Sequence, residues 1–249
     1  MIIIKNDKEI DLMRIAGRIV AETLLLVEKK VKPGITTAEL DRIAEEFITK
    51  HGAIPSFKGL YGFPASLCIS VNEQVVHGIP GGYVLKEGDI VSVDCGAHIN
   101  GFHGDAARTF AVGNISEQAN KLIKVTEESF FKGLEFAKVG NRLTDISHEI
   151  QRYVEASGFS VVRDFVGHGI GRSVHEDPEI PNFGRPGRGP KLVTGMTLAI
   201  EPMVNMGTYR VATLGDDWTV VSADKSLSAH YENTVVILPD GPEILTLIK

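Results

Sequence analysis

Apolar residues recur at intervals of three and four over residues 7–30 of this 249-residue chain. Ile10 and Met13 are among those on one face, which is the pattern of an amphipathic helix. Asn6 and Glu9 have the spacing of a capping box, so they mark the beginning of this helix. We therefore predict a helix over residues 7–30, preceded by a short strand.

The same periodicity returns in three further stretches. Thr36 and Glu39 have the capping-box spacing ahead of the second stretch, and His51-Gly52 ends it. A third stretch covers residues 117–138, and a fourth follows it and ends at Ser157-Gly158. The pattern therefore predicts two pairs of consecutive helices.

Residues 53–112, between the two helix pairs, have the pattern of strands and turns. Apolar runs on both sides of Asn100-Gly101 predict a β-hairpin there. Asp94 and Asp105 fall on its two strands, among apolar neighbours. Buried carboxylates that face each other repel and lose hydration, which raises a pKa strongly unless a cation lies between them. The hairpin therefore suggests a metal site.

The second half of the chain repeats features of the first half. Three pairs of residues share one offset: Gly34 and Gly140, Leu40 and Ile146, Gly52 and Gly158. The residues around Asp94 and Asp105 resemble those around Glu201 and Glu232. Repetition at a constant offset indicates an internal duplication.

This repetition predicts an α+β fold built from two α/β halves related by a pseudo-twofold axis. The halves would cover approximately residues 7–115 and 116–249, and residues 1–249 would form a single catalytic domain. A curved antiparallel sheet would carry the helices on its outside. The acids of both halves would then converge in the cleft.

Four carboxylates, those of Asp94, Asp105, Glu201 and Glu232, carry a charge that two divalent cations would balance. His168 is the best candidate for a single imidazole ligand. This mixture of oxygen and nitrogen ligands suits Mn, Fe(II), Co or Zn. Two such ions about 3.5–4 Å apart can share a hydroxide and polarise a carbonyl, which points to metal-assisted hydrolysis.

Two further histidines, His77 and His175, lie in loops close to the acids in chain order. Each is either a donor to a substrate carbonyl or tetrahedral intermediate, or a loop histidine with no catalytic part. The remaining histidines are expected to be structural: His51, His98, His103, His148 and His230.

The composition excludes several classes of protein. A formal net charge of −6 argues against DNA and general nucleic-acid binding, and no apolar run approaches the ~18 residues of a membrane span. No signal-peptide pattern is present, so we expect a cytoplasmic protein. Cys68 and Cys95 are too few for a disulfide framework or a structural zinc site. Residues 167–171 lack the spacing of a phosphate-binding loop, and the loop with Arg185 and Arg188 is a solvated connection or, less often, an RNA contact.

Several motifs together resemble those of the bacterial type I methionine aminopeptidases, a group of metallopeptidases. The motifs are Val76–Pro80, Asp94–Gly96 with Asp105, Gly167–Arg172, His175–Pro178, Ile180–Asn182, Ala199–Pro202 and Ser228–Glu232. The similarity runs from about Lys8 to the end of the chain. It implies the pita-bread fold and removal of the initiator methionine from nascent proteins when the second residue is small.

The resemblance also implies a role for each site residue. Asp94 would bind one metal ion in bidentate fashion, Asp105 and Glu232 would bridge two divalent ions, and His168 and Glu201 would complete the other ion. The nucleophile would be a hydroxide between the ions, with Glu201 as proton shuttle. His77 and His175 would hold the substrate and the intermediate. The implied partners are nascent polypeptide N-termini, with a transient ribosome contact, and the protein is expected to be a monomer.

The methionine pocket of this family is lined by aromatic residues and a cysteine. Phe63, Cys68 and Trp218 match in kind. Leu60 and Val174 stand where Tyr and Phe are frequent, and His230 stands where Gln is common, so the shape and affinity of the pocket are expected to differ.

Two alternatives remain on sequence grounds. The first is a binding module on the same fold, which would be expected to lose metal ligands, whereas all five are present. The second is a proline-specific peptidase of the same superfamily, which usually carries an additional N-terminal domain.

Overall fold

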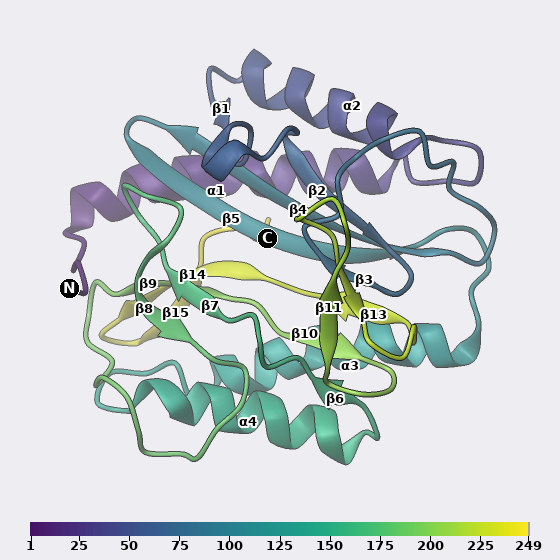
Figure 1. Cartoon of the computed structure of the whole chain (residues 1–249). Coiled ribbons are helices and arrows are strands. Elements are labelled where there is room, and N and C mark those ends of the chain that lie inside the picture. Colours follow the sequence, from purple (N-terminus) through teal and green to yellow (C-terminus); the bar gives the residue numbers. More distant parts are fainter. Residues whose placement is uncertain (249) are drawn as a thin grey trace.

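A computed structural model describes residues 1–248 of the chain. Its helices form two pairs, one on each side of the strands (Figure 1). The first pair is α1 (Asp7–Glu28) and α2 (Thr37–Lys50), and the second is α3 (Glu117–Leu134) and α4 (Leu143–Ala156). A short 3-10 helix, η1 (Leu60–Gly62), lies in the first half. The two predicted helix pairs are therefore confirmed.

Both predicted capping boxes are present at the beginnings of α1 and α2. The Asn6 side chain accepts from the backbone N–H of Glu9, whose carboxylate accepts from the backbone N–H of Asn6. Thr36 and Glu39 repeat this exchange. The ends of α1 and α3 come earlier than predicted, because the chain tightens there into bonds three residues apart, such as Ala137 N–H to Leu134 O at 3.0 Å.

The short strand predicted before α1 is wrong. Residues 1–6 form no strand, because in the described part of the chain only one backbone–backbone hydrogen bond joins them to a neighbouring loop, from the Lys5 N–H to Gly195 O at 2.9 Å. The Lys5 ammonium is buried and forms an ion pair with Glu176. This segment therefore connects to the body of the protein through a loop and a side chain rather than a sheet.

The first sheet contains the predicted hairpin. Its strands are β1 (Ile54–Pro55), β4 (Ile90–Ile99) and β2 (Leu67–Val71), and β5 (Phe102–Ala111) pairs with the other side of β4. Ile90 pairs with Ala111 and Ile99 with Phe102. Asn100 and Gly101 form the turn, both with positive φ (53° and 81°), as a two-residue hairpin turn requires.

A second antiparallel sheet comes from the other half of the chain. Its order is β15 (Gly241–Ile244), β14 (Asn233–Leu238), β9 (Thr197–Ile200), β7 (Gly167–Gly169) and β8 (Glu176–Ile180). Two smaller sheets comprise β13 (Ser228–His230), β10 (Met203–Asn205) and β6 (Ser160–Val161), and β11 (Val211–Thr213), β12 (Val220–Ser222) and β3 (Gln74–Val76). The predicted α+β class with antiparallel strands is confirmed.

Two large apolar clusters hold the layers together. One packs α1 and α2 on the first sheet, and the other packs α3 and α4 on strands of the second half. The strands β5 and β14 meet between them, because Ala107 and Glu232 exchange backbone hydrogen bonds (2.9 and 3.3 Å). This contact places the hairpin acids beside those of the second half. No helix within residues 1–248 is long and apolar enough to cross a bilayer.

Candidate metal centre

Asp94 and Asp105 are diagonal neighbours on one face of the β4–β5 hairpin. Asp94 pairs with Ala107, and Gly96 pairs with Asp105. Residues two apart along a strand point to the same face, so both carboxylates project from the same side of the sheet. The hairpin therefore brings these two acids together, as its pattern predicted.

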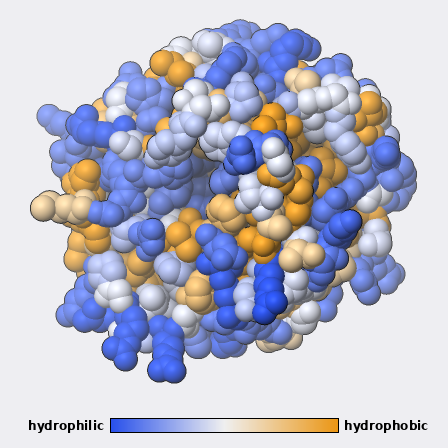
Figure 2. Space-filling model, in the orientation of Figure 1, coloured by the Kyte–Doolittle hydropathy of each residue, from blue (hydrophilic) through white to orange (hydrophobic). Residues whose placement is uncertain are grey.

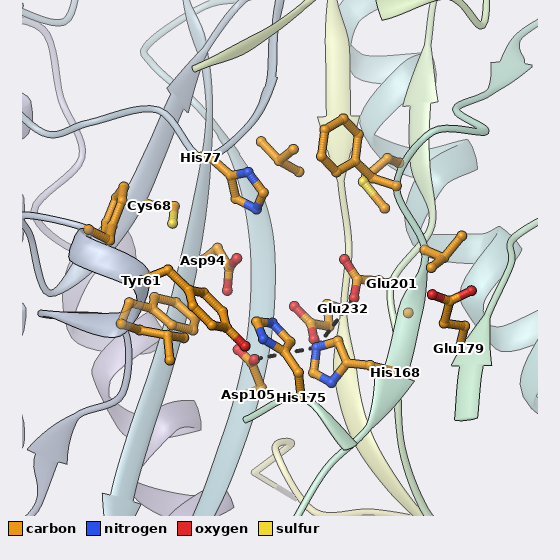
Figure 3. Close-up of a pocket in the computed structure, with 18 of the residues that line it drawn as sticks. Tyr61, Cys68, His77, Asp94, Asp105, His168, His175, Glu179, Glu201 and Glu232 are labelled. Atoms are coloured by element: carbon orange, nitrogen blue, oxygen red, sulfur yellow. Dashed lines mark ion pairs between the residues drawn. The ribbon is translucent and has the colours of Figure 1, made fainter. Parts of the chain in front are cut away.

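The second half contributes Glu201, Glu232 and His168 to the same place. Glu232 precedes β14, and the Ala107 contact holds it against β5. His168 on β7 pairs with Ala199 on β9, the strand that Glu201 follows. Figure 3 shows the two aspartates on one side and the other three side chains opposite them.

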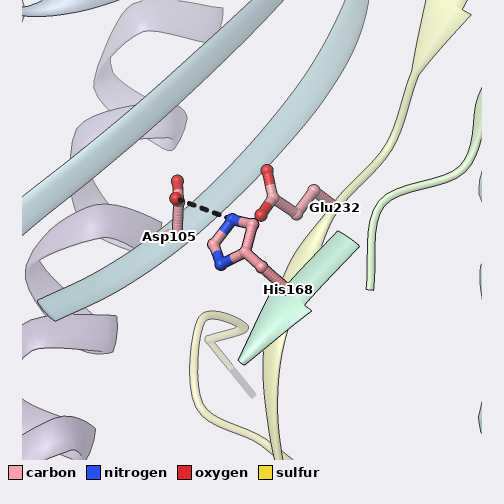
Figure 4. A group of neighbouring side chains, drawn as sticks. All are labelled: Asp105, His168 and Glu232. Atoms are coloured by element: carbon pink, nitrogen blue, oxygen red, sulfur yellow. Dashed lines mark ion pairs between the residues drawn. The ribbon is translucent and has the colours of Figure 1, made fainter. Parts of the chain in front are cut away.

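The imidazole of His168 is oriented for ligation by its Nε2 atom. Its Nδ1 atom lies 2.9 Å from Gly169 O, so Nδ1 carries the proton that it donates there and Nε2 has the free lone pair. Nε2 lies 3.6 Å from Glu201 Oε1 and 3.9 Å from Asp105 Oδ2. Asp105, His168 and Glu232 present ligand atoms that all lie within 4.8 Å of one another (Figure 4).

The four carboxylates lie in an environment that opposes their charge. Burial raises the pKa of Asp94 to about 7. Burial, and then repulsion from neighbouring carboxylates, raises the pKa values of Asp105, Glu201 and Glu232 well above their ordinary values. Burial also lowers the pKa of His168 to about 4, so this imidazole is neutral near pH 7. Divalent cations would relieve this repulsion.

The polar atoms of the cluster fit metal ligation. Asp94 Oδ1, Asp105 Oδ1 and Glu232 Oε1 are buried and have no hydrogen-bond partner among residues 1–248. Unsatisfied buried carboxylate oxygens are costly unless a cation binds them. The residues present therefore fit a site for divalent cations, with oxygen ligands and imidazole.

The cluster opens into a cavity of about 660 Å³, a volume typical of small-ligand sites. Figure 2 shows this face hollowed near its centre, with hydrophobic side chains beside the hollow. The predicted site residues that line the cavity are Leu60, Phe63, Cys68, His77, Asp94, Asp105, His168, His175, Glu201, Trp218 and Glu232. The structure thus brings all of them to one cavity.

His77 and His175 border the cavity from two sides. The His175 ring lies edge-on to that of His168, with centroids 4.6 Å apart, and the His77 ring packs against Phe165 at 5.5 Å. Burial lowers the pKa of His77 to about 4 and also lowers that of His175. Both are therefore neutral imidazoles near pH 7, each with one N–H to donate.

An apolar compartment adjoins the carboxylates. Phe63 and Trp218 meet edge to face, with ring centroids 5.0 Å apart. The apolar cluster contains Phe57, Phe63, Ala65, Cys68 and Val174, with Leu60, Ile79 and Trp218 packed against it. Burial raises the pKa of Cys68 well above its ordinary value, so this residue is a neutral thiol and no nucleophile.

Several residues that line the cavity were not predicted from the sequence, among them Tyr61. Tyr61 lines the cavity, is 77% exposed, and stacks on His175 with centroids 5.9 Å apart. His230, which we expected to be structural, has Nε2 3.7 Å from Glu201 Oε2, so its side chain lies beside the carboxylates. The signals in the sequence were that Tyr61 follows Leu60, a predicted pocket residue, and that His230 lies two residues before Glu232.

The other histidines that we expected to be structural make hydrogen bonds or ring contacts to protein groups. His51 and His148 place Nδ1 2.8 and 3.2 Å from the carbonyls of Phe47 and Gly184. His103 hydrogen-bonds Ser56 Oγ at 2.9 Å, and His98 stacks on its ring.

The fold and this cluster together define a metal-dependent hydrolase of the pita-bread architecture. Residues 11–239 match the model of metallopeptidase family M24, and the chain belongs to that family. It is 80% identical to a methionine aminopeptidase of Clostridium perfringens over 249 residues, which is 100% of both chains. It is 59% identical to methionine aminopeptidase 1 of Bacillus subtilis, again over 100% of both chains.

Solved structures agree with this assignment. The crystal structure of methionine aminopeptidase from Thermotoga maritima superposes with a TM-score of 0.98 and 49% identity, covering 100% of both chains. A prolidase from Pyrococcus furiosus superposes with a TM-score of 0.82, but at 23% identity, over 99% of this chain and 66% of that one. The second likeness concerns the fold alone.

Proposed function

We propose that this chain is a methionine aminopeptidase, which hydrolyses the peptide bond after an N-terminal methionine. The observation that carries the proposal is the junction of two surfaces in one cavity. Buried carboxylates and His168, the candidate metal ligands, form one part of its wall, and an apolar compartment with Phe63, Cys68 and Trp218 forms another. Relatives that match this chain over its whole length carry the same name.

The proposed cofactors are two divalent cations, chosen from Co, Mn, Fe(II) and Zn. Their ligands would be Asp94, Asp105, His168, Glu201 and Glu232, of which Asp105 and Glu232 would bridge. The number two is supported by charge, because two divalent cations balance four buried carboxylates. When bound, such cations polarise the scissile carbonyl and lower the pKa of the attacking water.

Glu201 is the proposed proton carrier. Burial, followed by repulsion from Asp94 and Asp105, raises the pKa of this carboxyl. A carboxylate whose pKa lies closer to neutrality can take a proton from the attacking water and pass it to the departing amine. Its Oε1 and Oε2 atoms both face the cluster, at 3.6 Å from His168 Nε2 and 3.7 Å from His230 Nε2.

His77 and His175 are the proposed substrate donors. Both line the cavity as neutral imidazoles, so each offers an N–H to the substrate carbonyl oxygen as it gains negative charge. Donors that are fixed before the reaction stabilise this charge more than water does.

The apolar compartment is the proposed methionine pocket. A methionine side chain is flexible and apolar, and its sulfur makes favourable contacts with aromatic edges such as those of Phe63 and Trp218. Leu60 and Cys68 complete the wall. The preference for a small second residue is proposed from the family resemblance.

The cellular setting is likewise part of the proposal. The substrates would be N-termini of nascent polypeptides in the cytoplasm, reached through a transient ribosome contact by a monomeric enzyme. The net charge of −6 supports the absence of a DNA partner, and no membrane partner is proposed.

The test is release of the first residue from Met-Ala-Ser, Leu-Ala-Ser and Met-Pro peptides by the metal-free chain reloaded with Mn, Fe(II), Co or Zn. We expect release of methionine from Met-Ala-Ser, much slower release of leucine, and no activity in chelator. Preference for the residue before proline, whatever its side chain, would instead identify a proline-specific peptidase. Metal binding without cleavage of any peptide would identify a binding module.

A further inference from the structure

His230 is buried beside the four carboxylates, and Thr109 holds its backbone. It ends β13, where it pairs with Met203 of β10, and its side chain is 2% exposed. The backbone N–H of His230 donates to Thr109 Oγ1, and the Thr109 hydroxyl donates to the backbone carbonyl of His230, both at 2.9 Å. These two bonds fix the backbone from which the imidazole projects.

The Nε2 atom of His230 has no hydrogen-bond partner in the described part of the chain. It lies 3.7 Å from Glu201 Oε2 and 3.9 Å from Glu232 Oε2. These separations are too long for N–H···O hydrogen bonds, which span about 2.7–3.2 Å. They match ligand atoms that share one cation, since two atoms about 2.1 Å from an ion lie roughly 3–4 Å apart.

The arrangement around Glu201 repeats on its two sides. Oε1 of Glu201 faces His168 Nε2, whereas Oε2 faces His230 Nε2, at nearly equal distances of 3.6 and 3.7 Å. Glu201, His230 and Glu232 present ligand atoms within 4.8 Å of one another, as do Asp105, His168 and Glu232. The cluster thus contains two imidazoles in equivalent relations to the carboxylates.

We propose that His230 is a metal ligand, and that Glu201, His230 and Glu232 form a nitrogen-containing cation position beside that of Asp105, His168 and Glu232. The inference rests on the proposed function, because it extends the same metal centre. A second imidazole favours cations that accept nitrogen, such as Zn and Fe(II), over Mn.

The test uses the full-length chain with 15N-labelled histidine, made metal-free and titrated with Zn²⁺ while the ring nitrogens are followed by NMR. Comparison of wild type with His230→Gln and His168→Gln assigns the two signals. His103→Gln is the matched control, since His103 contacts Ser56 outside the cluster. We expect Zn²⁺ to shift the Nε2 signals of both His168 and His230 in the wild type and the control, and only that of His168 in His230→Gln.

Equilibrium dialysis with Zn²⁺ gives a second measure that does not depend on catalysis. His230→Gln should weaken the binding of one Zn²⁺ by about tenfold or more, whereas the metal-free thermal midpoint should stay near that of the His103→Gln control. A His230 signal that Zn²⁺ leaves unmoved while that of His168 shifts, or unchanged affinity in His230→Gln, would overturn the inference but leave the proposed function intact. Failure of both histidines to respond, together with no methionine release, would overturn both.

Discussion

Arg108 donates a hydrogen bond from Nη1 to the backbone carbonyl of Glu232 at 2.5 Å, so a side chain of β5 fixes the backbone of an acid from the second half. The same nitrogen donates to Ala107 O at 2.8 Å, and Nη2 donates to Asn233 Oδ1 at 2.7 Å. The guanidinium also lies over the Tyr231 ring, 4.3 Å from its centroid. Arg108 is therefore a positioning residue, because it acts through Glu232.

Replacement of Arg108 by lysine should lower the free energy of unfolding by about 2–4 kcal/mol, because an ammonium cannot make the forked bonds of the guanidinium to its four acceptors. Metal affinity should also fall, since Glu232 loses its support. Chemical denaturation and equilibrium dialysis measure the two effects. The control Arg18→Lys alters an exposed helical pair with Glu22 and should change stability by less than about 0.5 kcal/mol. Equal effects in the two variants would contradict the positioning role.

Asp105→Asn should abolish methionine release and lower metal content, because it removes one of the two proposed bridging charges. In the metal-free protein the same substitution should raise the thermal midpoint, since burial and repulsion from Glu232 and Asp94 oppose the charge of Asp105. Differential scanning fluorimetry with and without chelator measures both states. Retained activity with normal metal content would refute the assignment.

The metal-free protein should become less stable as the pH rises through neutrality. The pKa of Asp94 is raised from 3.8 to about 7, so between these two values the Asp94 carboxyl binds more protons in the folded state than in the unfolded chain. The corresponding stability is present at low pH and is lost as the pH rises through about 7. Thermal midpoints in chelator across this window test the sign, and Asp94→Asn should flatten the profile. A profile with the same slope in Asp94→Asn as in the wild type would contradict the raised pKa of Asp94.

His175→Ala should reduce kcat by ~10²–10⁴-fold with metals still bound, in line with loss of one donor to the reacting carbonyl. Steady-state kinetics and metal analysis of the same preparation separate the two effects. A loss below about tenfold would mean that His175 has no catalytic part.

Trp218→Leu should raise KM for Met-Ala-Ser roughly threefold to tenfold with a smaller change in kcat, because the edge-to-face contact with Phe63 that supports the pocket wall is lost. Metal content should not change. Phe47→Leu on α2 provides the control, since this ring contacts His51 away from the cavity. Similar KM values for both variants would exclude Trp218 from the pocket.

Local features of the sequence determined the secondary structure and half of the candidate centre. Asn6 with Glu9 and Thr36 with Glu39 marked the helix beginnings, because a capping box involves neighbours three residues apart. Asn100-Gly101 fixed the hairpin turn and therefore the register that sets Asp94 and Asp105 diagonally on one face. Each of these features depends on residues close together in the chain.

Only the tertiary structure decided how the other half of the centre meets the hairpin. Glu232 lies beside Asp105 because β14 packs on β5, and His230 faces Glu201 because β13 pairs with β10. No local pattern predicts that a buried imidazole lies 3.7 Å from Glu201, since that distance depends on where separate strands pack. The physical reason is that short-range hydrogen bonding sets helices and turns, whereas long-range packing sets the distances between side chains from different strands.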